Sequence, residues 1–210
     1  TESIQYRWED LCAGADPDEV ENVRDYLEMI HSEAFRCRDI TARMLDFARG
    51  DDGVRTSNNL TQIVADVLLM VKPMSQFRDR NIEFSRTEPC MAEVNGPEIK
   101  QVVLNLVANS LEAMQSGGTL RIDVTEQVDH AIVTFQDDGC GMTPEVIENI
   151  FEPFFTRRKD GRGTGLGMAI SHRIISDHGG TVEVSSDGPG CGSTFRLNIP
   201  RRAPNSQSAA

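Results

Sequence analysis

The stretch TRRKDGRGTGLGMAISHRI, residues 156–174, places a run of alternating glycines directly before a helical pattern. The glycines are Gly161, Gly163, Gly165 and Gly167. Glycine permits positive φ and lets backbone N–H groups approach a ligand closely, and a helix that starts there adds the positive end of its dipole. The expected ligand is therefore a phosphate group. A flexible surface loop is the alternative, which the glycines alone do not exclude.

The spacing of these glycines excludes the commoner nucleotide-binding motifs. Residue 166 is Leu and residue 168 is Met, so the G-x-G-x-x-G fingerprint of dinucleotide-binding folds is absent. The chain also contains no G-x-x-x-x-G-K-[ST] sequence, so it carries no P-loop. A phosphate bound here must be held by another kind of site.

A second glycine cluster lies upstream, in VTFQDDGCGM, residues 133–142. Asp137 stands at the end of an apolar strand pattern, and Gly139 and Gly141 follow it. A carboxylate at a strand end, beside glycines that allow close approach, can accept a hydrogen bond from an amino group such as that of adenine. A plain Asp-Gly turn is the alternative.

The third element is the helical segment KQVVLNLVANSLEAM, residues 100–114, whose polar side chains follow a single stripe. Gln101, Asn105, Asn109 and Glu112 recur at helical spacing among apolar neighbours. Two Asn side chains would be costly to bury without partners. Binding Mg²⁺ together with phosphates and waters is one way to satisfy their oxygens, and a solvent-facing stripe is the alternative.

Outward from these segments, the pattern predicts an α+β layered domain rather than a strict βαβ alternation. Helices are expected over 60–79, 97–114, 144–150 and 165–178, with Pro73 tolerated or kinking the first of them. Strands are expected over 81–87, 119–127, 130–137, 181–187 and 193–200. Residues 50–59 are expected to be a connector. Residues 51–200 are predicted to form this domain, followed by a disordered polar tail over 201–210.

The first fifty residues predict part of a helical hairpin. Residues 1–12 are expected to be the end of one helix, and Asp16 and Glu19 form a capping box that opens the next. Apolar side chains then recur at steps of three and four from Val20 to Ala48, and the pattern ends at Gly50. An amphipathic helix of this length needs a partner, so residues 1–50 are expected to form a partial hairpin that dimerises into a bundle.

Composition narrows the range of partners. The net charge of −12 argues against nucleic acid, and the chain has no apolar run of about 18 residues, so no membrane contact is expected within it. The five scattered cysteines show no metal-site spacing and favour reduced thiols in the cytoplasm. Thr1 in place of an initiator Met suggests a fragment of a longer protein, which could be membrane-anchored.

Four segments, in this order, together resemble the conserved boxes of sensor histidine kinases: NLVANSLEA, DDGCGM, FEPFF and GRGTGLGMAI. The closing segment, residues 177–200, resembles that family as well, and the likeness extends over roughly residues 20–200. The resemblance implies a Bergerat-type ATP-binding α/β sandwich, with helices layered over a mixed sheet, preceded by part of the dimerisation hairpin.

The resemblance also implies roles for the polar and glycine residues. Asn109 is expected to bind Mg²⁺, with Asn105 in support, and Asp137 to accept the adenine amino group. Gly139 and Gly141 are expected to shape the adenine pocket.

The segment from Phe151 to Gly163 is expected to be a mobile lid, anchored by Phe154 and Phe155. Phosphates are expected at Gly163, Gly165 and Gly167. The remaining expected ATP contacts are Glu112, Phe154, Gly161, Thr164 and Leu166. The candidates for reaching the β- or γ-phosphate are the three residues of a basic run, Arg157, Arg158 and Lys159. A solvated lid surface is the alternative interpretation of this run. These three and the two Asn residues make up the expected catalytic set.

Residue 105 discriminates best between the reactions that such a site supports. Topoisomerase and mismatch-repair ATPases, which share the fold, carry a Glu four residues before the Mg²⁺-binding Asn. This chain has Asn105 there, which cannot act as a general base. Transfer of the γ-phosphate to a protein histidine is therefore expected, with an ATPase clamp or a non-catalytic nucleotide-binding scaffold as alternatives.

The acceptor histidine is expected upstream of Thr1, because none of His31, His130, His172 and His178 has the expected acidic neighbour on a first hairpin helix. The expected partners are a second copy of the chain and the receiver domain of a response regulator.

Overall fold

The computed structural model describes residues 16, 20–31, 34, 54–74, 77–86, 88–156 and 164–202. The chain divides into two compact units, Thr1–Asp51 and Asp52–Ala210. In the first unit residues 20–31 are helical, and the Val20 N–H donates to the Asp16 carbonyl over 3.0 Å, where the sequence predicts a helix start. The remainder of the predicted hairpin, and most of the polar tail, lie outside the described residues.

The second unit is built on a five-stranded mixed sheet in the order β2-β4-β5-β7-β6. The strands are β2 (Asn81–Glu83), β4 (Thr119–Glu126), β5 (His130–Asp137), β6 (Thr181–Ser185) and β7 (Ser193–Pro200). β2 runs parallel to β4, and the other neighbours are antiparallel. In β5 alternate side chains, among them Val133 and Phe135, are buried, which is the period of a sheet with one covered face.

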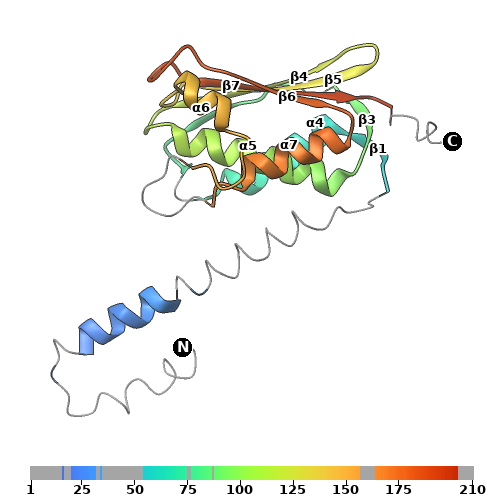
Figure 1. Cartoon of the computed structure of the whole chain (residues 1–210). Helices are drawn as coiled ribbons and strands as arrows, with labels where there is room; N and C mark the ends of the chain where they lie inside the picture. The colour runs from blue at the N-terminus through green and yellow to red at the C-terminus, as the bar shows by residue number, and fades with distance from the viewer. Residues whose placement is uncertain are drawn as a thin grey trace. The chain divides into compact units, whose positions relative to one another are not determined.

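Three helices cover that face of the sheet (Figure 1). They are α4 (Leu60–Val71), α5 (Gly96–Ala113) and α7 (Gly167–Asp177), and a short α6 (Pro144–Asn149) lies between β5 and α7 in the chain. The central helix, α5, packs against α4, α7 and β5. It buries Val102, Val103 and Leu106 completely. The predicted α/β sandwich is confirmed. Of the described helices, not one is sufficiently long and apolar to cross a membrane.

The N-terminus of α7 is capped differently from those of α4, α5 and α6. Asn59, Asn95 and Thr143 cap α4, α5 and α6 by accepting hydrogen bonds from first-turn N–H groups. The cap position of α7 is Leu166, which has no side-chain acceptor to offer. The first turn of α7 therefore keeps backbone donors that no cap side chain satisfies.

Several predicted boundaries are wrong, for local reasons. The helix predicted over 60–79 ends at Val71, because Pro73 lacks an N–H and its ring clashes with a preceding turn. The helix predicted from Gly165 begins two residues later, since Gly165 has φ +66°. The strands predicted over 81–87 and 181–187 are shorter, ending at Glu83 and Ser185.

The predicted connector over 50–59 contains a strand. β1 (Thr56–Asn59) pairs antiparallel with β3 (Met91–Val94) to form a separate two-stranded sheet. β1 is the polar sequence TSNN and shows no alternation that could have identified it.

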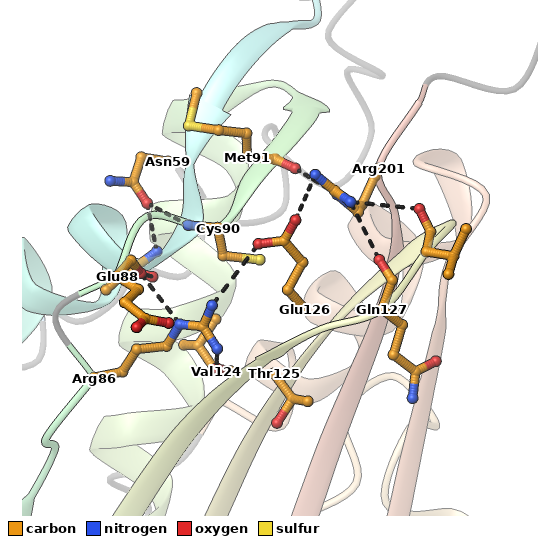
Figure 2. A network of polar contacts seen from close by, with 12 residues as sticks. Asn59, Arg86, Glu88, Cys90, Met91, Val124, Thr125, Glu126, Gln127 and Arg201 are labelled. Atoms are coloured by element: carbon orange, nitrogen blue, oxygen red, sulfur yellow. Dashed lines mark hydrogen bonds and ion pairs between the residues drawn. The ribbon is translucent and has the colours of Figure 1, made fainter.

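A cluster around Arg201 joins this small sheet to the large one (Figure 2). The Arg201 guanidinium pairs with Glu126 at 2.6 Å and donates to the carbonyl oxygens of Met91 and Gln127, both at 3.2 Å. Arg86 approaches the same Glu126 carboxylate at 3.8 Å. The strand register places this cluster at the opposite end of β4 and β5 from Asp137.

Candidate functional site

Asp137, the last residue of β5, is a buried carboxylate with only 4% of its surface exposed. Its Oδ1 accepts the Gly139 N–H over 2.9 Å. Burial raises the pKa of this carboxyl above its ordinary value of 3.8. Hydrogen bonding from Gly139, Ser110 and Ser193 opposes that rise, and the neighbouring Asp138 adds to it. An ionised carboxylate accepts at about four lone-pair positions, so these three donors leave acceptor capacity for a ligand.

Two serines beside Asp137 were not anticipated from the sequence. The Ser110 hydroxyl on α5 is buried with no hydrogen-bond partner of ordinary geometry among the described residues, yet it lies close enough to Asp137 to favour the charged carboxylate. Ser193 contributes its backbone N–H from the first residue of β7. Each comes from a segment distant in sequence, so no local pattern signals it.

The loop after Asp137 has room for no side chain at its two glycines. A Cβ at Gly139 would lie 2.7 Å from Asp137 Oδ1 and 2.8 Å from the carbonyl oxygen of Ala113. Gly141 has φ +62°, and a Cβ there would overlap the carbonyl oxygen of Gly188. The Cys140 N–H donates to Ala113 over 3.0 Å, which seats the loop on the end of α5.

The polar stripe of α5 runs from the middle of the helix toward this loop. Asn105 and Asn109 are half-buried and Glu112 is exposed. Asn105 donates its amide to the Gly167 carbonyl oxygen over 3.2 Å and approaches Ser171 Oγ at 3.3 Å. Asn105 is thus not part of a purely solvent-facing stripe. Its amide hydrogens are directed to α7, which leaves its oxygen available.

The start of α7 lies at the other end of that contact. Leu166 is buried, and its N–H approaches the Thr164 hydroxyl at 3.4 Å. The Phe154 N–H donates to the Gly165 carbonyl over 3.0 Å. Phe154 has φ +68° and leaves 59% of its surface exposed, an uncommon conformation for an aromatic residue.

The structure therefore joins several of the predicted site residues. It connects α5 to the start of α7 through Asn105 and Gly167, and to the loop after Asp137 through Ala113. Five predicted residues lie outside the described part of the chain: Arg157, Arg158, Lys159, Gly161 and Gly163. Among the described residues there is no cluster of three or more His, Cys, Asp or Glu side chains that could bind a metal.

This arrangement suits a ligand that is polar at both ends. A buried carboxylate beside close-approach glycines favours a hydrogen-bond donor. The uncapped first turn of α7 offers N–H donors and a positive dipole end to an anion. Between the two lie the amide side chains of α5.

Comparison with known proteins gives a consistent result. The family model "Histidine kinase-, DNA gyrase B-, and HSP90-like ATPase" matches residues 95–203. Sporulation kinase C of Bacillus subtilis is 30% identical over 182 residues, which is 86% of this chain and 42% of that protein. The chain thus spans less than half the length of this curated relative.

Solved structures agree. The catalytic domain of histidine kinase ThkA is 30% identical, with a TM-score of 0.64 over 71% of this chain and 97% of that one. ThkA in complex with the response regulator protein TrrA matches at 26% identity and a TM-score of 0.70, over 95% of this chain and 56% of that one.

Proposed function

The chain belongs to the family of histidine kinase-, DNA gyrase B- and HSP90-like ATPases, and from this premise we propose that it is the ATP-binding kinase module of a two-component phosphorelay. In this proposal it binds Mg²⁺–ATP and transfers the γ-phosphate to a histidine on a dimerisation helix. A response-regulator aspartate receives the phosphate next. Residues 1–50 serve dimerisation, and residues 51–200 bind the nucleotide.

The observation that carries the proposal is that one site contains both the buried Asp137 carboxylate and the helix start of α7 that no cap side chain satisfies. Asp137 accepts the adenine amino group, with Gly139 and Gly141 forming the pocket wall. Thr164, Gly165 and Gly167 approach the phosphates, as favoured by the first-turn N–H groups of α7 that the cap residue, Leu166, does not satisfy.

The side chains of α5 fit a magnesium ion that is held mainly by phosphates. Asn109 and Asn105 would bind Mg²⁺ through their amide oxygens, because Mg²⁺ prefers oxygen and usually keeps several waters. The contacts of Asn105 are compatible with this, since its nitrogen is the atom directed to Gly167 and Ser171. The ion would neutralise phosphate charge during transfer.

Transfer is favoured over hydrolysis by the chemistry of residue 105. An amide has no basic group with which to activate water. Moreover, its nitrogen already contacts α7. An ATPase clamp would need a carboxylate at this position.

The acceptor is proposed to lie outside these 210 residues. His178 is unsuitable because it is buried, with 3% of its surface exposed. His172 is exposed on α7, where its ring lies 5.0 Å from that of Phe151. Neither lies on a dimerisation hairpin.

The helix over residues 20–31 supports a homodimer. Val23 and Ile30 belong to the predicted apolar seam, and both are exposed in the single chain. A second copy would bury them. A receiver domain is proposed as the other partner because a solved relative, ThkA, is described in complex with a response regulator.

The test uses the whole chain with γ-labelled ATP and Mg²⁺. Alone, the chain should bind ATP and remain unlabelled. Adding a separate dimerisation hairpin that carries an acceptor histidine should produce acid-labile label on that hairpin, and Asn109→Ala should abolish it. Sustained phosphate release without labelling would instead favour the ATPase clamp, and tight binding without transfer would favour the scaffold. Label on the chain alone that is lost in His31→Gln would identify His31 as the acceptor.

A further inference from the structure

Ser186 joins two loops that border the candidate nucleotide site. It is half-buried and follows directly after β6. Its hydroxyl donates to the Gly192 carbonyl oxygen over 2.6 Å and accepts the Met142 N–H over 2.9 Å. One side chain thus bridges the loop that follows Asp137 and the connection between β6 and β7.

The two loops touch at further points around Ser186. The Gly192 N–H donates to the Gly139 carbonyl over 3.1 Å, and the Gly190 N–H donates to Cys140 over 2.7 Å. Gly141 has no side chain and lies against the carbonyl of Gly188. We refer to residues 186–192 as the clamp, because they contact residues 139–142 at these several points. The name denotes this segment alone and is unrelated to the ATPase clamp considered above.

The clamp also determines the surroundings of Asp137 itself. A Cβ at Gly192 would overlap the Asp137 backbone carbonyl, so the end of the clamp runs directly beside this residue. Ser193, next in the chain, contributes its N–H to the Asp137 carboxylate. Movement of the clamp would therefore move both the wall of the pocket and a donor to its carboxylate.

We propose that Ser186 is a positioning residue for adenine recognition, acting through Met142 and Gly192 rather than by touching the nucleotide. Without the hydroxyl, the Met142 N–H and the Gly192 carbonyl both lose a partner. The pocket then spends less time in the shape that presents the Asp137 carboxylate to the 6-amino group, so the apparent affinity for a ligand that carries this group falls by that fraction. A ligand that lacks the group loses little affinity. The inference rests on the proposed function, since it assumes that adenine binds at Asp137.

The experiment compares Ser186→Ala with Ser185→Ala, the same change at the exposed neighbouring serine. Affinities of the whole chain are measured for ATP and for purine riboside triphosphate, which lacks the 6-amino group. The preference for ATP should fall about tenfold in Ser186→Ala and stay unchanged in Ser185→Ala. Ser186→Thr, which retains the hydroxyl, should keep most of the preference. Circular dichroism confirms that each variant is folded.

The ratio of the two affinities separates positioning from a merely structural role. General destabilisation weakens both ligands equally and leaves their ratio intact, so an unchanged ratio in Ser186→Ala overturns the inference. Failure of the wild-type chain to bind ATP overturns the proposed function, and this inference with it. Wild-type binding with preference for ATP, followed by equal behaviour of the two alanine variants, overturns the inference alone.

Discussion

The side-chain amide of Asn105 donates to the backbone carbonyl oxygen of Gly167 over 3.2 Å, which ties the middle of α5 to the first residue of α7. The Ser171 hydroxyl donates to the same carbonyl over 2.9 Å. Residue 105 is therefore more than a candidate metal ligand. It fixes the position of the helix start that we propose to bind phosphate.

Asn105→Asp should weaken ATP binding even though it retains an oxygen for a metal ion. The carboxylate has no hydrogen to donate to Gly167 and places a negative charge near the carbonyl and the phosphates. We expect a loss of about 1–3 kcal/mol in the free energy of unfolding and a clear rise in the ATP dissociation constant, measured by urea denaturation and calorimetry. Gln101→Glu makes the same amide-to-carboxylate change one turn earlier and should have little effect. Equal losses in the two variants would show that charge on α5, not the bond to Gly167, is responsible.

ATP binding should weaken on acidification at a higher pH than an ordinary aspartate would produce. The ionised carboxylate of Asp137 is a stronger acceptor for the adenine amino group than the protonated carboxyl. Burial raises its pKa, so protonation begins at a higher pH as the solution is acidified. Because the pKa is raised, the folded chain binds this proton more tightly than the unfolded chain does. The free energy of unfolding therefore falls as pH rises from 3.8 through the raised folded pKa. A pH series of ATP titrations checks the first effect.

Asp138→Asn provides the control for that pH series. The Asp138 charge raises the pKa of Asp137. Removing that charge should therefore shift the acid limb, which is the fall in ATP affinity at low pH, to a lower pH while ATP binding is retained. Asp137→Asn should instead weaken binding at every pH and remove the limb. A limb that persists in Asp137→Asn belongs to a different group.

Gly141→Ala and Gly117→Ala together test the close contact between the clamp and the loop after Asp137. Both glycines have positive φ, but a Cβ at Gly117 meets nothing within 4 Å, whereas one at Gly141 overlaps the Gly188 carbonyl. Gly117→Ala should cost about 1–2 kcal/mol from its backbone conformation alone. Gly141→Ala should cost more and abolish ATP binding. Thermal melts measure the loss of stability, and ATP titration measures the loss of binding. Equal stability losses in the two variants would show that the backbone at Gly188 moves to accommodate the added Cβ.

His178 should make the fold sensitive to mild acid. Its Nε2 accepts the Asn95 N–H over 3.0 Å and its Nδ1 lies 2.7 Å from the Ile174 carbonyl, so the ring is neutral with the hydrogen on Nδ1. Burial lowers the pKa of this histidine below 6.5, and Arg55 adds to the lowering, while the Ile174 bond and Asp177 oppose it. Glu98 also faces Nε2, at 3.7 Å.

The unfolded chain takes up a proton near the ordinary pKa of 6.5 while the folded chain does not, so the free energy of unfolding falls as pH drops below that value and levels off below the folded pKa. His178→Gln should reduce this dependence, and His172→Gln, at an exposed position on α7, the helix that His178 directly follows, should leave it intact. Urea denaturation at about pH 7.5 and 5.5 measures the change in the free energy of unfolding between the two pH values. The same change in His178→Gln as in the wild-type chain would exclude His178 as its source.

The sequence was informative wherever the pattern is local. The alternation in β4, β5 and β7 identified the sheet. Asp137 could be selected because it ends a strand and precedes two glycines. The stripe on α5 placed Asn105 on a polar face, although the identity of its partner was not predictable.

What could not be predicted depends on distant contacts. Asn105 and Ser171 are 66 residues apart, and Met142 and Ser186 are 44 apart. A lone serine after a strand carries no local signal that it will bridge two loops. The pairing of β1 with β3 was missed because a short polar strand is defined by its neighbour and not by its own residues.

The Arg201 cluster has a consequence for anyone who recombines this domain with a relative. The residue follows directly after β7, where a boundary drawn from the strands alone would cut the chain. Its charge partner, Glu126, lies on β4, and its remaining bonds reach β3 and the turn between β4 and β5. A chimera that mismatches these two positions either leaves the half-buried Arg201 guanidinium without its carboxylate or leaves Glu126 with only the more distant Arg86, at 3.8 Å. The two positions are best inherited together.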